Sequence, residues 1–151
     1  MQPIEAFAKV ASEFCSWAES EPADPVEEAA RAVKLLSRLV ALVHDLPGDF
    51  GNEDPRDISH EQWLVVYKRF GSLPFNYYAC YADPYLAEAP CPGMGDLADD
   101  LADTWRDIKG GLCLYEGGNH AAAAWEWRES FNIHWGRHAA SALYALQCWR
   151  S

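Results

Sequence analysis

The sequence predicts an all-α fold: one domain over residues 1–151, built as a bundle of four to five helices with one long irregular crossover. Three observations support this prediction. Apolar residues recur every three or four positions through most of the chain, no segment has the alternation of a strand, and Pro, Gly, Asn and Asp gather in a few separating segments. With 151 residues and 50% hydrophobic composition, the chain can bury one core.

The first two helices are expected over residues 3–20 and from Pro25 to just before Pro47. Asp24 can cap the second helix, Pro25 suits its first position, and Glu27 stands where a capping box has a carboxylate. The expected apolar faces are Phe7, Val10, Phe14 and Trp17 in the first helix, and Ala29, Ala32, Val33, Leu36, Leu39, Val40 and Val43 in the second.

The middle of the chain predicts a loop, a short helix and an irregular crossover. Residues 47–58 have loop composition, and the pair Ser59 and Gln62 has capping-box spacing at the start of a helix that ends by Gly71. Residues 75–95 are rich in tyrosine and are expected to form a helical turn and a crossover without strands. Prolines break any longer helix there, at Pro84, Pro90 and Pro92.

Two more helices are expected in the C-terminal part. Apolar residues share one face from Leu97 to Tyr115, and Gly117 and Gly118 end this helix. Asn119 can cap a last helix that runs to the C-terminus. We therefore expect these two helices to pack side by side.

Charge and cysteine content restrict the partners and the location. Twelve basic and 23 acidic residues give a net charge of −11, which disfavours nucleic acid and anionic membranes as partners. No apolar run is long enough to span a bilayer, and the first residues lack the basic region and apolar stretch that are typical of a signal peptide. The five cysteines are scattered, without a C-x-x-C pair, so we expect free thiols and a cytoplasmic protein.

The segment Trp125–His138, "WEWRESFNIHWGRH", indicates a polar cluster beside the core. Projected at 100° per residue, Arg128 falls within the apolar face of the last helix, where an unpaired charge costs several kcal/mol. We expect Arg128 to pair with Asp103 or Asp107. Glu126 is placed in the same cluster.

His134 and His138 lie four residues apart on the same helix, a spacing that lets two imidazoles bind one divalent metal ion. A third ligand is needed, and either His44 or an aspartate of the helix 97–115 can supply it. The alternative is that both histidines donate hydrogen bonds to carbonyl or carboxylate groups and pack against aromatic neighbours. No other cofactor is indicated.

An acidic stripe in the helix 97–115 has two interpretations. It lies nearly opposite the apolar face, which favours a solvated surface or a layer of salt bridges with arginines. Alternatively, its carboxylates bind a divalent cation such as magnesium, although the paired Glu-x-x-Glu and Glu-x-x-Asp motifs of helical nucleotide pyrophosphohydrolases are missing. The stripe comprises Asp96, Asp100, Asp103 and Asp107.

Two families resemble this chain. The run from Leu97 to Leu146 resembles the DUF5063 family of bacterial proteins, which implies a helical single-domain protein without an assigned activity. The similarity is densest at Asp103, Trp105, Arg106, Asp107, Lys109, Trp125, Glu126, Arg128, His134, Trp135, Gly136 and His138. More distantly, His44, His134 and His138 resemble the metal ligands of DinB-like helical bundles, but the residues around "HWGRH" do not match and His44 stands at a helix end.

Two main functions therefore stay open. One is an interaction or accessory protein that binds an unknown protein partner, which an exposed aromatic patch at Trp63, Tyr77, Tyr78 or Trp149 would favour. The other is a hydrolase or transferase whose divalent metal activates a water molecule. They differ in whether three ligand atoms converge on one point.

Overall fold

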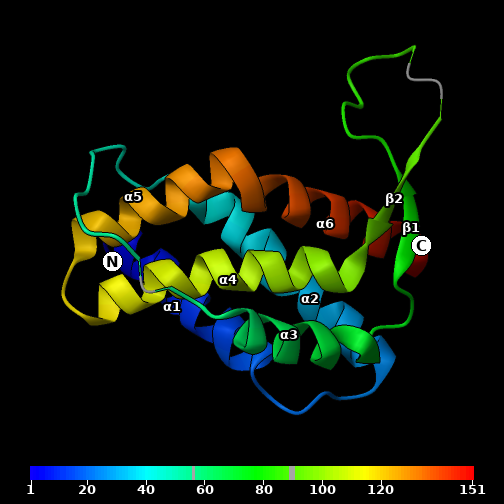
Figure 1. Ribbon diagram of the computed structural model, residues 1–151, viewed down its shortest axis with the longest axis horizontal. Coiled ribbons are helices and arrows are strands. Elements are labelled where there is room, and N and C mark those ends of the chain that lie inside the picture. Colours follow the sequence, from blue (N-terminus) through cyan, green and yellow to red (C-terminus); the bar gives the residue numbers. More distant parts are fainter. Residues whose placement is uncertain (56, 89–90) are drawn as a thin grey trace.

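The computed structural model describes residues 1–55, 57–88 and 91–151, and its helices surround one central helix (Figure 1). The helices are α1 (Pro3–Ala18), α2 (Pro25–Val43), α3 (His60–Arg69), α4 (Leu97–Glu116), α5 (His120–Ser130) and α6 (Gly136–Arg150). A π-helical segment, Phe131–Trp135, joins α5 to α6, so that these form one continuous helix, here named the long helix. The prediction of an all-α bundle is confirmed.

The helix starts show that the local signals act as expected. The Asp24 carboxylate accepts a hydrogen bond from the amide of Glu27 at 3.1 Å at the start of α2. Both hydrogen bonds of the Ser59 and Gln62 capping box are present at the start of α3. Asn119 precedes α5, but its side chain makes no capping hydrogen bond.

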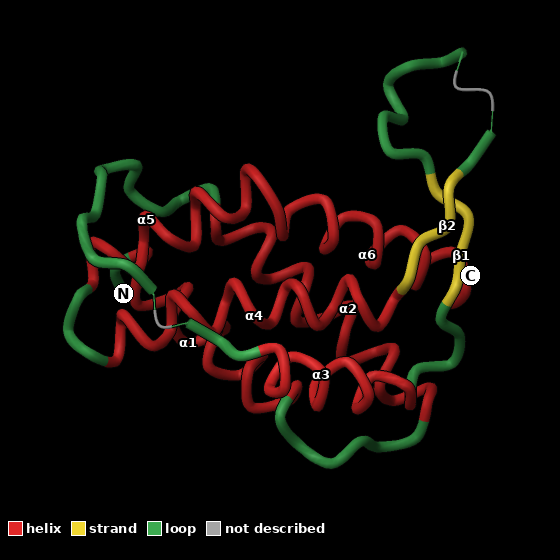
Figure 2. The backbone as a smooth tube through the Cα atoms, viewed as in Figure 1, coloured by secondary structure: helices red, strands yellow, loops and turns green. Residues whose placement is uncertain are grey.

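A short antiparallel hairpin replaces part of the crossover expected over residues 75–95. Its strands are β1 (Tyr77–Cys80) and β2 (Gly93–Asp96), and Figure 2 shows them at the end of the bundle beside the C-terminus. The expectation that this segment has no strands was wrong, because four-residue strands are too short to show alternation. Tyr78 pairs with Gly95, where a Cβ would overlap the tyrosine ring. The helix break expected at Pro90 lies outside the described residues.

α4 packs against helices on all sides. It contacts α1, α3, α5 and α6, and the strand β2 leads into its first turn. Trp127 is fully buried against it and donates a hydrogen bond to the carbonyl of Ile108 at 2.9 Å. A helix enclosed in this way cannot keep one face in solvent, so polar residues on its second face also meet protein. None of the described helices is long and apolar enough to cross a membrane.

The π-helical segment sets the direction of the histidines. Trp127, Trp135 and Ala139 are all fully buried, and the half-buried Phe131 completes a row in steps of four residues. In an ideal α-helix each such step drifts by about 40°, because four residues turn by about 400°. The wider π turn takes up this drift. It therefore keeps one side of the long helix against α4, and this side carries His134 and His138.

Candidate metal centre

Two histidines of the long helix face three aspartates of α4. His134 Nδ1 lies 2.6 Å from Asp107 Oδ2, and His138 Nδ1 lies 2.8 Å from Asp100 Oδ1. The positions 100, 103 and 107 follow each other one helical turn apart, as do 134 and 138. Each imidazole thus has a carboxylate of its own at Nδ1, which leaves both Nε2 atoms for another partner.

That partner is the same atom for both rings. His134 Nε2 and His138 Nε2 each lie 3.2 Å from Asp103 Oδ2. Ligands about 2.1 Å from a tetrahedral metal ion are about 3.4 Å apart, so these separations match a shared ion. Asp99, Asp100 and His138 form a second group of three possible ligands within 4.8 Å of each other. The two groups share His138, but both histidines have short contacts with Asp103, so Asp103, His134 and His138 are the candidate ligands and Asp99 lies outside this set.

Asp103 is held in place through its other oxygen. Trp63 Nε1 of α3 donates a hydrogen bond to Asp103 Oδ1 at 2.8 Å, and Arg106 Nη2 donates to the same oxygen at 3.1 Å. The side chain of Asp103 is 13% exposed. These two donors turn Oδ2 toward the histidines, in the way that outer hydrogen bonds orient metal ligands.

The hairpin supports His138 through Asp100. The hydroxyl of Tyr78 in β1 donates a hydrogen bond to Asp100 Oδ2, while the other oxygen of Asp100 faces His138. At the start of α4, Asp96 accepts hydrogen bonds from Tyr67 and Asn76, each at 3.0 Å. The chain before α4 therefore helps to fix the carboxylates of its first turns.

The electrostatics follow from this partial burial. Burial raises the pKa values of Asp100 and Asp107, although hydrogen bonds from the histidines oppose the change. Burial acts in the same direction on Asp103, yet its hydrogen bond to His138 and the positive charges nearby hold its pKa below the usual value. Hydrogen bonds to Asp100 and Asp103 raise the pKa of His138 to about 10. In metal-free protein at neutral pH, His138 is therefore protonated.

An open cleft of about 410 Å³ lies beside the centre, here named the hairpin cleft. The hairpin, the start of α4 and the long helix form its walls, and both histidines reach it. Such a volume is in the range of small-molecule sites. The lining side chains include Tyr78, Tyr81, Met94, Asp96, Asp99, Asp100, Ile133, His134, Arg137, His138 and Ser141.

Two residues predicted for the cluster or the metal site lie elsewhere or have other partners. Arg128 donates to the carbonyl of Leu46 and not to Asp103 or Asp107. The π turn follows Arg128, so the direction of this side chain relative to His134 and His138 differs from that in a regular α-helix. His44 is exposed at the end of α2, where its ring meets Phe131 edge-on at 5.2 Å, and it belongs to neither group of possible ligands.

Glu126 and the acidic stripe are partly where they were expected. Glu126 borders a small crevice with Asp107, and its pKa is raised by burial and by the negative charge of Asp107. The solvated-surface interpretation of the stripe was wrong, since Asp100 is 5% exposed. A layer of polar contacts is present instead, in which both histidines contact the aspartates and protonated His138 supplies a positive charge.

Sequence reasoning missed three residues that hold the centre: Trp63, Tyr78 and Arg106. Trp63 and Tyr78 were considered for an exposed aromatic patch and not as partners of the aspartates, since no spacing rule links them to α4. Arg106 follows Asp103 by three residues, so the i, i+3 spacing was a usable signal.

Comparisons with known proteins identify the family and the fold. The structure resembles the crystal structure of protein BF1032 from Bacteroides fragilis with a TM-score of 0.82 and 22% sequence identity, covering 99% of this chain and 93% of that chain. At this identity the likeness concerns the fold alone. A search of curated proteins found no match. The sequence model of the domain of unknown function DUF5063 matches residues 2–151, and the chain therefore belongs to the DUF5063 family.

Proposed function

We propose that the chain binds one divalent metal ion through His134 Nε2, His138 Nε2 and Asp103 Oδ2, and that it is a metal-dependent hydrolase. The observation that carries this proposal is that both Nε2 atoms lie 3.2 Å from the same carboxylate oxygen. Partners at both Nδ1 atoms and at the second oxygen of Asp103 add support, because functional metal sites hold their ligands in this way.

The ligand set favours a transition-metal ion of the zinc class. Two imidazoles and one carboxylate suit zinc or iron better than magnesium, which prefers oxygen ligands. Three protein ligands leave a position for water, and zinc lowers the pKa of such a water to about 7. Water activated beside the hairpin cleft would attack a bound substrate. A transferase reaction would use the same centre with another acceptor.

The interaction-protein hypothesis has less support. It relied on exposed aromatic residues, but Trp63 and Tyr78 donate hydrogen bonds to Asp103 and Asp100 inside the centre. Of the four residues named for such a patch, Tyr77 and Trp149 are exposed, to 65% and 43%. A single tyrosine and a half-exposed tryptophan are common on surfaces without a partner.

A cytoplasmic location belongs to the same proposal. All five cysteines are free, and burial raises the pKa of Cys15 strongly. Free thiols are usual in a reducing compartment. Exclusive recovery of native protein from an oxidising compartment would contradict this part.

The test is metal content. Protein purified without an affinity tag is analysed for metals and melted with added zinc, nickel, manganese or magnesium. Wild type should carry or take up about one zinc-class ion per chain and melt at a higher temperature with it. His134→Ala, His138→Ala and Asp103→Asn should lose both responses, whereas His44→Ala, which removes an exposed histidine outside the centre, should keep them.

Circular dichroism separates loss of the ion from loss of the fold. Folded variants at positions 134 and 138 that still bind one ion would overturn the proposal, as would wild type that neither carries nor takes up metal. If the variants unfold, metal-dependent protection of wild type from proteolysis gives the same decision.

A further inference from the structure

The hairpin cleft has one carboxylate that the protein does not use. Asp99 lines the cleft, and within the described residues its carboxylate accepts no hydrogen bond and joins no ion pair. We infer that Asp99 binds the ammonium group of a small organic amine whose apolar body lies against the hairpin. Its role as substrate depends on the proposed metal centre, but its binding does not.

The neighbouring polar groups of the cleft have partners already. Asp96 accepts from Tyr67 and Asn76, and Asp100 accepts from Tyr78 and contacts His138. An incoming cation therefore finds Asp99 as the available carboxylate among these three.

The cations of the cleft are also engaged, since protonated His138 faces Asp100 and Asp103. Arg137 Nη2 donates to the carbonyl of Ala82 at 2.6 Å and lies 3.2 Å from Asp83 Oδ1. Even with a divalent ion bound, the five aspartates of the α4 region outnumber the positive charges of the ion, Arg106 and Arg137. Anionic ligands such as phosphate esters are therefore disfavoured, and the chain as a whole carries −11.

Apolar side chains surround the opening. Met94 of β2 is 76% exposed, Ile133 of the π-helical segment 71% and Tyr81 after β1 48%, and all three line the cleft. Exposed apolar residues around a cleft indicate a binding site when they come from separate segments and lie together. Tyr81 also offers a ring face to a cation. A ligand with a cationic head and an apolar body fits both features.

The experiment is an NMR titration of the full chain with matched ligands. Phenethylamine is compared with 3-phenylpropanoate, which has a similar body and the opposite charge, in zinc-loaded and metal-free protein. Nα-acetyl-lysine methylamide is a third ligand, because a lysine side chain carries the same ammonium chemistry. Stronger binding of phenethylamine assigns the cleft to free amines, and stronger binding of the lysine derivative assigns it to protein lysines.

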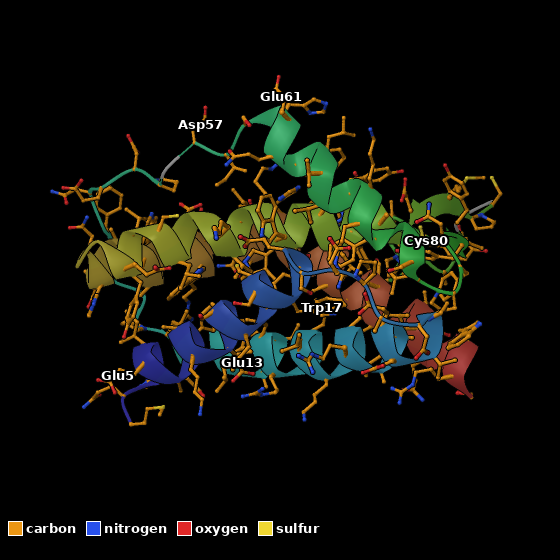
Figure 3. The ribbon with its side chains drawn as sticks, turned by 90° about the horizontal axis from the view of Figure 1, so that it is seen from below. Glu5, Glu13, Trp17, Asp57, Glu61 and Cys80 are labelled. Carbon is orange, nitrogen blue, oxygen red and sulfur yellow. The ribbon has the colours of Figure 1, made fainter. Side chains whose placement is uncertain are left out.

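Two variants connect binding to Asp99. Asp99→Asn should weaken amine binding by about tenfold, because a hydrogen-bonded charge pair is replaced by a neutral contact. Glu61→Gln makes the same change in net charge on the outer side of α3, where Figure 3 shows Glu61 pointing away from the protein, and should leave binding unchanged.

The inference fails if the carboxylate ligand binds as well as the amine, or if Asp99→Asn has no effect. It also fails if phenethylamine binds only zinc-loaded protein, since the amine would then coordinate the ion directly. Zinc content is measured on the same samples. Loss of zinc binding in wild type would contradict the proposed function, while amine binding to metal-free protein would still stand.

Discussion

Asp107→Asn tests whether the outer carboxylates are part of the metal centre. Asp107 Oδ2 lies 2.6 Å from His134 Nδ1, and the Asp107 side chain is 17% exposed. An asparagine of nearly the same shape can still accept a hydrogen bond from Nδ1 through its carbonyl oxygen. The substitution thus removes the negative charge while it keeps the space filled.

The expected loss can be worked from this contact. Hydrogen bonds to charged groups contribute about 1.5–3 kcal/mol and neutral ones about half of that. The substitution therefore removes roughly 1–1.5 kcal/mol from the hydrogen bond that orients the His134 ring and raises its basicity. Loss of an outer partner of a metal ligand commonly lowers metal affinity by about 10–100-fold, or about 1.4–2.7 kcal/mol. We therefore expect zinc affinity at the lower end of this range, about tenfold weaker than in wild type.

The assay is competition for zinc against a chromophoric chelator at fixed pH and ionic strength. Asp57→Asn is the matched control, because Asp57 borders the same crevice as Asp107 but is exposed on the loop before α3 (Figure 3). Cobalt-loaded protein gives a spectrum that reports ligand geometry. Affinity within twofold of wild type, or an equal loss in Asp57→Asn, would refute the reasoning.

Three further predictions concern stability. The raised pKa of His138 stabilises the metal-free fold fully below pH 6.5, its ordinary pKa, and this contribution is lost as the pH rises toward 10. Denaturant titrations of wild type should therefore show a free energy of unfolding that falls over this pH range, and His138→Gln should reduce the fall. Gly111→Ala should destabilise by about 1–3 kcal/mol, measured by urea unfolding, because its Cβ would overlap the indole of Trp127. Arg69→Ala should lower the free energy of unfolding by about 3–5 kcal/mol in the same assay, since Glu28 is 2% exposed and would lose its cationic partner. Adding Glu28→Gln to this variant should recover part of the lost stability.

The helices could be predicted because their signals are local. Capping at Asp24 and Ser59 uses atoms within three residues, and the apolar period of α1 and α2 is regular. The hairpin could not be predicted in the same way, since Tyr78 and Gly95 pair across a connection of twelve residues. The π-helical segment could not be predicted either, since four-residue steps between apolar residues also occur on one face of an ordinary α-helix.

The candidate site was predicted in its residue types but not in its arrangement. His134 and His138 lie on one side of the long helix as their spacing indicates, and of the suggested third ligands it is an aspartate of α4, Asp103, that meets them. Arg128 was assigned to this aspartate because a constant 100° per residue was assumed. The π turn lies between Arg128 and His138, so no constant period describes both.

The acidic stripe of α4 departs from the usual pattern of an amphipathic helix, and this departure coincides with the candidate site. Acids opposite an apolar face belong in solvent when a helix covers one side of a bundle. α4 does not follow this rule, because α1, α3, α5 and α6 all pack against it. Asp100 is therefore buried and Asp107 half-buried, and burial raises their pKa values. Burying several carboxylates together destabilises the fold unless cations offset them. Protonated His138 supplies one positive charge in the metal-free protein, and a divalent ion at Asp103 would supply two while releasing that proton. The same residues that make the metal-free fold less stable are therefore the ones that would make metal binding favourable.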